Sequence, residues 1–188
     1  MKIYSYLIPF IIFFSCEKNI SQHGYQRNPE WELADEIYDN EIGKKVFCQL
    51  RKEKKLQVCE SGWDLRSKKK IQVMHCGFFY YEDLNIDQAR ELLLSAGILY
   101  LTTINENERI RNFLETYPFK LENIEIRIFL YDSNRSIPSP EKLQVISMID
   151  GILEYENRSS DTKFLTTICQ ETYEEAMAKI NASKSISL

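Results

Sequence analysis

Apolar residues recur at helical spacing in two long segments of the chain. In the first segment they stand three or four residues apart and so share one face of a helix; they are Trp31, Ala34, Tyr38, Ile42, Val46 and Leu50. This stripe predicts an amphipathic helix over about residues 30–54. The second segment, residues 85–117, begins at a candidate N-cap, Asn85, and ends before Pro118. It predicts a long helix in which Gly97 lets a strand approach closely.

Alternating and aromatic-rich segments predict five strands. Leu56 and Val58 alternate with polar neighbours until Ser61–Gly62 ends the strand. The other predicted strands are residues 70–81, 123–131, 143–155 and 163–169, and a short helix over about 173–180 follows. Links of hairpin length join neighbouring strands, which is typical of antiparallel pairing. The predicted fold class is therefore α+β, with a long helix packed on a mostly antiparallel sheet in the order α-β-β-α-β-β-β-α.

Composition narrows the class of protein. The chain has 188 residues, of which 44% are hydrophobic and 28% are charged, and its formal net charge is -4. These values suit one compact domain with a core, and they exclude a disordered or collagen-like chain. Because the net charge is negative, we expect no nucleic-acid partner.

The first 16 residues, MKIYSYLIPFIIFFSC, have the pattern of a secretory signal. Lys2 and the amino terminus supply a positive start, and an almost uncharged apolar stretch follows from Ile3 to Phe14. About a dozen apolar residues are too few to span a bilayer, which takes roughly 20. Polar residues begin again at Glu17. The segment therefore predicts export rather than a lasting transmembrane helix.

The end of this segment resembles the lipobox of bacterial lipoproteins, where a small residue precedes a cysteine that is lipidated and becomes the mature N-terminus. Ser15 and Cys16 match the pattern, whereas Phe13 and Phe14 depart from the usual leucine and small or β-branched residue. The resemblance implies that Cys16 carries acyl chains of the palmitate type, and two or more such chains hold a domain on a membrane almost permanently. An ordinary cleaved signal peptide and an uncleaved anchor are the alternatives.

The predicted organisation has three parts: a signal peptide over residues 1–15, a lipidated tether over residues 16–29 and a single α+β domain over residues 30–188. Between Glu53 and Met177, the order of elements and phrases such as NENERIRNFLETYPF and NIEIRIF are similar to a group of uncharacterised secreted proteins and lipoproteins of Gram-negative bacteria. The resemblance brings no activity. It implies a place in the bacterial cell envelope, with the lipid in the inner or outer membrane and the domain in the periplasm or at the surface.

Four cysteines remain once Cys16 is assigned to the lipid, and an exported protein can pair them in three ways. We expect a Cys59–Cys76 disulfide, because a hairpin register with these two opposite one another also sets Leu56 opposite Phe79 and keeps the alternation in phase. The alternative is four reduced cysteines that act as small buried hydrophobes.

No motif in the sequence assigns a reaction. Zinc needs converging ligands, and the adjacent strand residues His75 and Cys76 point to opposite faces, so we predict no metal. We assign no catalytic residue and no cofactor. The favoured function is a non-catalytic, lipid-anchored envelope protein that uses a sheet face or edge to bind another envelope protein. The alternatives are a periplasmic hydrolase that uses His75 with a carboxylate, and a ligand-binding domain with a pocket between the long helix and the sheet.

Overall fold

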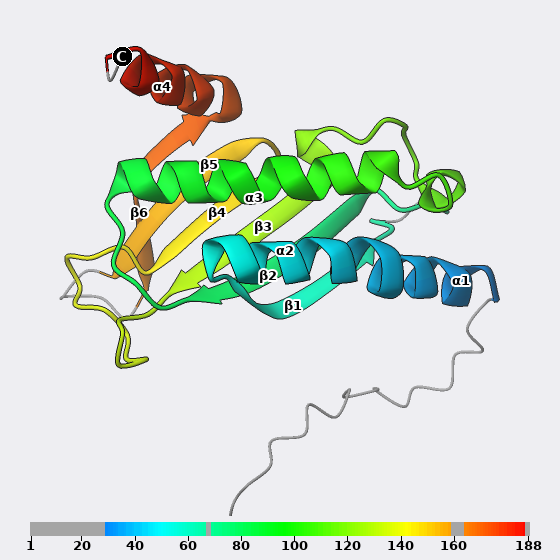
Figure 1. Ribbon diagram of the computed structural model, residues 1–188, viewed down its shortest axis with the longest axis horizontal. Coiled ribbons are helices and arrows are strands. Elements are labelled where there is room, and N and C mark those ends of the chain that lie inside the picture. Colours follow the sequence, from blue (N-terminus) through cyan, green and yellow to red (C-terminus); the bar gives the residue numbers. More distant parts are fainter. Residues whose placement is uncertain (1–28, 67–68, 159–163, 187–188) are drawn as a thin grey trace, which may run out of the picture.

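The computed structural model describes residues 29–66, 69–158 and 164–186 of the chain. A six-stranded sheet carries the N-terminal helical segment and the longest helix side by side on one of its faces (Figure 1). The predicted signal peptide and Cys16 lie outside the described residues. The α+β class and the mostly antiparallel sheet are confirmed. Among the described helices, none combines the length and the apolar character that crossing a bilayer requires.

The N-terminal helical segment contains a π-helical turn. Helix α1 (Pro29–Ile37) is followed by η1, a π-helix over Tyr38–Gly43, and then by α2 (Lys44–Lys54). The predicted extent of about 30–54 is therefore confirmed, although the segment is not α-helical throughout. It ends at Lys55, which adopts the left-handed conformation at φ 59°. Inserted π-helical turns are rare in helices and occur frequently at functional sites.

Helix α3 (Ile86–Glu106) begins at the predicted N-cap. The side chain of Asn85 accepts a hydrogen bond from the backbone N–H of Gln88 at 2.9 Å, and the Gln88 side chain accepts one from the Asn85 N–H at 3.0 Å. This reciprocal pair is a capping box. The helix is shorter than the predicted 85–117, so that prediction is wrong at its C-terminal end.

Asparagine side chains explain the early end of α3. Asn105 binds both the N–H of Phe119, at 2.8 Å, and its carbonyl oxygen, at 2.9 Å, while Asn107 accepts a bond from the N–H of Ile110 at 3.0 Å. These bonds turn the chain out of the helix. The apolar residues beyond it still reach the core, with Ile110 in the 3₁₀-helix η2 (Ile110–Phe113) fully buried. A second 3₁₀-helix, η3 (Leu121–Asn123), leads into the next strand.

The sheet follows the order of the chain. Its strands, in spatial as in sequence order, are β1 (Gln57–Asp64), β2 (Val73–Tyr80), β3 (Ile124–Leu130), β4 (Val145–Ile149), β5 (Ile152–Arg158) and β6 (Leu165–Thr172). All neighbours pair antiparallel except β2 and β3, which are parallel. The parallel pair follows from α3, which crosses over the sheet between them.

The described sheet has six strands, and the prediction of one strand over residues 143–155 is wrong. Asp150 and Gly151 both have positive φ, at 50° and 76°. Two such residues form the two-residue turn that joins tight hairpins, so β4 and β5 are separate strands. Strand β1 is longer than predicted, since it continues through Gly62 to Asp64. The predicted element order is therefore correct only in outline.

The core lies between the helices and the sheet. Its largest fully buried side chains include Tyr100, Tyr155, Phe78 and Phe119. A Cβ added at Gly97 would stand only 2.4 Å from Cε of Met148, so the missing side chain lets β4 approach α3 as predicted. This contact fills the space between the helix and the sheet at that point.

A buried ion cluster joins the last helix, α4 (Tyr173–Ile186), to the sheet and to α3. The carboxylate of Glu171, which is 1% exposed, accepts hydrogen bonds from Arg90 Nε, the Tyr155 hydroxyl and Lys179 Nζ, each at 2.6 Å. Arg90 also pairs with the exposed Asp87. We call Arg90, Tyr155, Glu171 and Lys179 the Glu171 cluster. Its charges are compensated, as buried charges must be.

Candidate functional site

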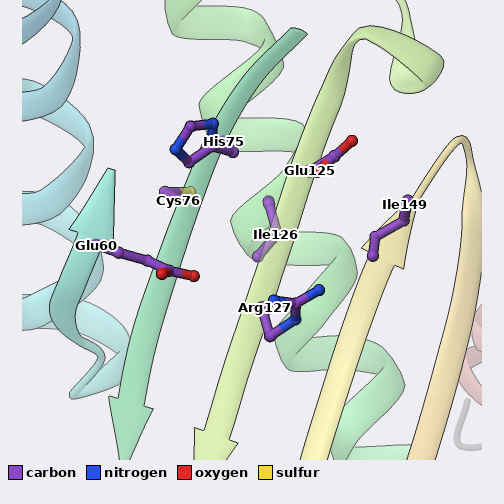
Figure 2. A pocket seen from close by; sticks show the side chains of 7 residues that line it. All are labelled: Glu60, His75, Cys76, Glu125, Ile126, Arg127 and Ile149. Carbon is purple, nitrogen blue, oxygen red and sulfur yellow. The ribbon is translucent and has the colours of Figure 1, made fainter. Parts of the chain in front are cut away.

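The sheet has one face under the helices and a second face, here called the open face, that carries the candidate site. Side chains alternate between the two faces along β3: Ile126 and Ile128 are buried toward the helices, while Arg127 is exposed on the other side. Figure 2 views the open face, with the helices behind the strands.

The strand register aligns polar side chains in two rows across the open face. The first row runs through Glu60, Gly77, Arg127, Ser147 and Glu154, and the second through Gly62, His75, Glu125 and Ile149. Each row contains a glycine. Neighbouring side chains can therefore lie across the sheet where a Cβ would otherwise stand.

The two glycines decide how Glu60 and His75 lie. A Cβ at Gly77 would come within 2.5 Å of Cγ of Glu60, and a Cβ at Gly62 within 3.0 Å of Nε2 of His75. The Glu60 side chain thus passes from β1 over Gly77 on β2, as Figure 2 shows. The His75 side chain extends the other way, from β2 over Gly62 on β1. The two side chains leave a hollow between them.

This hollow, here called the His75 hollow, has a volume of about 260 Å³. Its lining consists of Glu60, His75, Cys76, Glu125, Ile126, Arg127 and Ile149 (Figure 2). Arg66 forms an ion pair with Glu125 at its rim. Within the described part of the chain, the Glu60 carboxylate, the His75 imidazole and the Arg127 guanidinium have no hydrogen-bond or ion-pair partner. Three polar groups are thus available to a ligand.

Carboxylates dominate the open face. At its described strand positions there are two arginines, Arg127 and Arg158, and five carboxylates, of which Glu125 pairs with Arg66 beside the strand end; the others are Glu60, Asp64, Glu154 and Glu156. Burial raises the pKa of Glu156, repulsion from Glu154 raises it further, and Arg127 opposes the increase. The face therefore favours a ligand that brings positive charge.

An aromatic cluster continues the open face beyond the hollow. It consists of Phe79, Tyr81, Phe129 and Tyr131, whose ring centroids lie between 5.6 and 6.5 Å apart. Arg135 lies over the Tyr81 ring, 5.2 Å from its centroid. These rings are only partly buried, whereas Phe78 and Tyr80 point into the core. The cluster gives the open face an apolar part next to its charged part.

Two buried hydroxyls fix the backbone of β2 beneath the hollow. The Tyr38 hydroxyl, from η1, lies 2.8 Å from the Tyr100 hydroxyl and donates to the carbonyl oxygen of His75 at 3.1 Å. Burial raises the pKa of both tyrosines, so both stay neutral. The π-helical turn and α3 thereby hold the strand segment that carries His75.

The expected register around the cysteines is wrong. Cys76 lies opposite Ser61, and Cys59 is the extra residue of a β-bulge between Val58 and Glu60. All four described cysteines are free thiols. Burial raises the pKa of Cys59 to about 11, and that of Cys76 well above its ordinary value. The Cys59–Cys76 disulfide stays a prediction.

Of the residues singled out in the sequence, only His75 and Cys76 line the hollow. Sequence reasoning missed Glu60, Glu125 and Arg127. The alternation in NIEIRIF places Glu125 and Arg127 on one face of a strand, so their orientation was readable. Their position beside His75 depends on the parallel pairing of β2 with β3, which no local pattern predicts.

Comparisons with known proteins give no match: no family model fits the chain, and no curated protein or solved structure is sufficiently similar. In the residues that the structure describes, histidines, cysteines and carboxylates form no group of three placed to hold a metal ion. The proposed function therefore rests on the geometry of the open face.

Proposed function

We propose that the chain is a non-catalytic, lipid-anchored protein of the bacterial cell envelope, and that its open face binds another protein. The observation that supports this role is the open face itself, where the His75 hollow adjoins four partly exposed aromatic rings. Aromatic side chains and arginine are enriched at the centres of protein interfaces.

The partner we propose is a polypeptide segment with lysine or arginine side chains next to apolar ones. Its cations would meet Glu60 and Glu154, for which the described residues supply no ion pair. Its apolar side chains would cover the aromatic cluster, and Arg127 would bind a carboxylate or a backbone carbonyl of the segment. The rigid backbone beneath His75 suits such a contact, since a preformed surface loses little entropy on binding.

The geometry favours binding over hydrolysis. A histidine that acts as a general base stands within hydrogen-bond reach of a nucleophile, and a further group orients its ring. The described residues place neither kind of partner on the His75 imidazole, which instead lies over Gly62. Binding of a partner requires only exposed polar and aromatic side chains, and the open face has both.

Site-specific photo-crosslinking tests the binding role. A photoreactive phenylalanine analogue replaces Phe129 on the open face or, as a matched control, Ile98, which is 42% exposed on α3. In intact cells of the native bacterium, we expect one discrete adduct from position 129 and none from position 98. The adduct should disappear when Glu60→Gln and Glu154→Gln are combined. Equal adducts from both positions, or an adduct that ignores the glutamate changes, would contradict the proposal.

Metabolic labelling tests the anchor separately. Cells are fed a fatty-acid analogue, and the label is read on the wild-type protein and on Cys16→Ser. We expect label on the wild type alone. An unlabelled wild-type protein would refute the lipid anchor and would leave the crosslinking result as the measure of the binding role.

A further inference from the structure

A second pocket lies where the aromatic cluster meets the last two strands of the sheet. It is here called the Arg158 pocket and has a volume of about 200 Å³. Arg158 ends β5 and pairs in register with Leu165, the first residue of β6. The apolar part of the lining comes from three strands and from the segment between β3 and β4, and consists of Phe129, Leu130, Tyr131, Ile137, Val145 and Leu165. Arg158 is the one charged residue among the described residues of the lining.

The Arg158 guanidinium has an unsatisfied donor. Its Nε atom is buried and has no hydrogen-bond partner, and no other buried side-chain nitrogen or oxygen of the described residues shares this property. The guanidinium also forms no ion pair with a described residue, although Glu156 stands only two positions earlier on the same face of β5. Buried donors are almost always paired, so a ligand that brings an acceptor to Arg158 gains a strong bond. A carboxylate suits a guanidinium best, because it can accept two parallel hydrogen bonds.

The walls of the Arg158 pocket are formed before a ligand binds. Gln144, which also lines the pocket and is 6% exposed, donates from Nε2 to the carbonyl oxygen of Pro138 at 3.1 Å. The Asp132 carboxylate accepts from the backbone N–H groups of Asn134 and Ser136, at 2.9 and 2.8 Å. These bonds hold the segment between β3 and β4 against the strand ends. A ligand therefore has little of the protein to order.

The apolar lining determines what accompanies the carboxylate. Ile137 is 59% exposed and Leu165 is 40% exposed, so both offer apolar surface that a ligand can cover. The volume lies below the roughly 300–1,000 Å³ of sites for drug-sized molecules, so the bound group is small. A fully hydrated anion such as phosphate would lose its water to walls that are mostly apolar. The lining thus favours a short aliphatic group that ends in a carboxylate.

We propose that the Arg158 pocket binds a small apolar carboxylate, either a free aliphatic acid or the C-terminal residue of a polypeptide. The carboxylate would bind the Arg158 guanidinium, and the aliphatic group would pack against Val145, Ile137 and Leu165. The pocket shares Phe129 and Tyr131 with the aromatic cluster. Binding there nevertheless requires neither the His75 hollow nor the proposed partner of the open face.

The test is a titration of the purified full-length protein followed by saturation-transfer NMR of the ligand at constant ionic strength. The probe is sodium hexanoate, and the control ligand is hexanamide, which has the same chain without the charge. We expect saturable binding of hexanoate and at least tenfold weaker binding of hexanamide. Arg158→Gln should weaken hexanoate binding by about tenfold or more, because it removes the charge-assisted bonds. Arg51→Gln, a matched change on the exposed surface of α2, should leave binding unchanged.

A second variant keeps the test decisive if Arg158→Gln does not fold, which circular dichroism checks. Ile137→Asp changes an exposed side chain at the pocket and places a carboxylate beside the bound one, so hexanoate should again bind about tenfold more weakly. The proposal fails if hexanoate binding does not saturate, if hexanamide binds equally well, or if both folded variants keep full affinity. Inorganic phosphate that displaces hexanoate at equal concentration would also overturn it, because the pocket would then recognise charge alone.

A peptide separates the two sources of the carboxylate. The probe is a short acetylated peptide that ends in leucine with a free carboxylate, and its control is the same peptide with a C-terminal amide. A peptide acid that binds at least tenfold more tightly than hexanoate assigns the C-terminal residue of a polypeptide. A peptide acid that binds more weakly than hexanoate assigns the free aliphatic acid.

Discussion

The Glu171 cluster gives a quantitative prediction for Arg90→Met. Arg90 is 6% exposed at its side chain and Glu171 is 1% exposed, so the change removes one partner of a buried ion pair. Breaking such a pair costs about 3–5 kcal/mol, because the remaining charge stays buried. Two other donors, Tyr155 and Lys179, still reach the carboxylate. We therefore expect a loss in the free energy of unfolding near the lower end, about 3 kcal/mol.

Urea denaturation followed by circular dichroism measures this loss. Two further variants test whether it comes from the buried charge that is left without its partner. Lys179→Met removes a donor whose side chain is 53% exposed, so it should cost far less than Arg90→Met. The triple variant Arg90→Met/Tyr155→Phe/Glu171→Leu removes both buried charges together with the buried hydroxyl that donates to Glu171, and it should recover most of the loss. The reasoning is refuted if Arg90→Met costs no more than Lys179→Met.

The same cluster predicts how stability depends on pH. Burial raises the pKa of Glu171, but the hydrogen bonds from Lys179, Tyr155 and Arg90 outweigh it, and the net pKa is lowered from 4.5. A lowered pKa in the folded state stabilises the fold above the ordinary value of 4.5. That contribution is lost as the pH falls from there through the pKa of the folded protein. Glu171→Gln should therefore be less stable at neutral pH and should show a flatter decline below pH 4.5.

Three other measurements test the packing, the hairpin turn and the thiols. Gly97→Ala should change the free energy of unfolding by less than about 1 kcal/mol, because the better helix propensity of alanine offsets the displacement of the flexible Met148 side chain that its Cβ would meet; a loss of several kcal/mol would contradict this. Gly151→Val should lower stability in thermal denaturation by about 1–3 kcal/mol, since φ there is 76°, and an unchanged melting temperature would argue against the turn. In reduced protein, iodoacetamide should modify exposed Cys48 well before Cys76, whose pKa burial raises. The same mass measurement without reductant tests the predicted disulfide of Cys76, which full modification would exclude.

Local patterns predicted the elements well where one segment determines its own structure. The capping residue Asn85 and the alternation in β3 are examples, since both depend on neighbours a few residues away. The turn at Asp150–Gly151 was equally local. An Asp-Gly pair between alternating apolar residues is a strong hairpin signal, and it should have divided the predicted strand 143–155.

The remaining errors depend on contacts between distant segments. The apolar periodicity continues beyond Glu106, yet Asn105 binds the backbone of Phe119, and that bond decides where α3 ends. The candidate site likewise depends on contacts between segments that lie far apart in the sequence. Its composition depends on the parallel register that sets His75 beside Glu125, and on Gly77, which lets Glu60 cross β2. A single sequence shows the glycine without showing what lies over it.

The chain-ordered sheet determines how the domain would fold if the chain emerged N-terminus first. Every described strand pairs only with the strands next to it in sequence, and the β2–β3 pair forms across the α3 crossover. A chain translocated N-terminus first, as the predicted signal peptide implies, would deliver β1 and β2 before any later strand. When each later strand emerged, the strand that precedes it in the sheet would already be present. The domain could therefore fold from its N-terminal strands toward its C-terminal ones. Lys179 on α4 would then dock on Glu171 as one of the last steps of maturation.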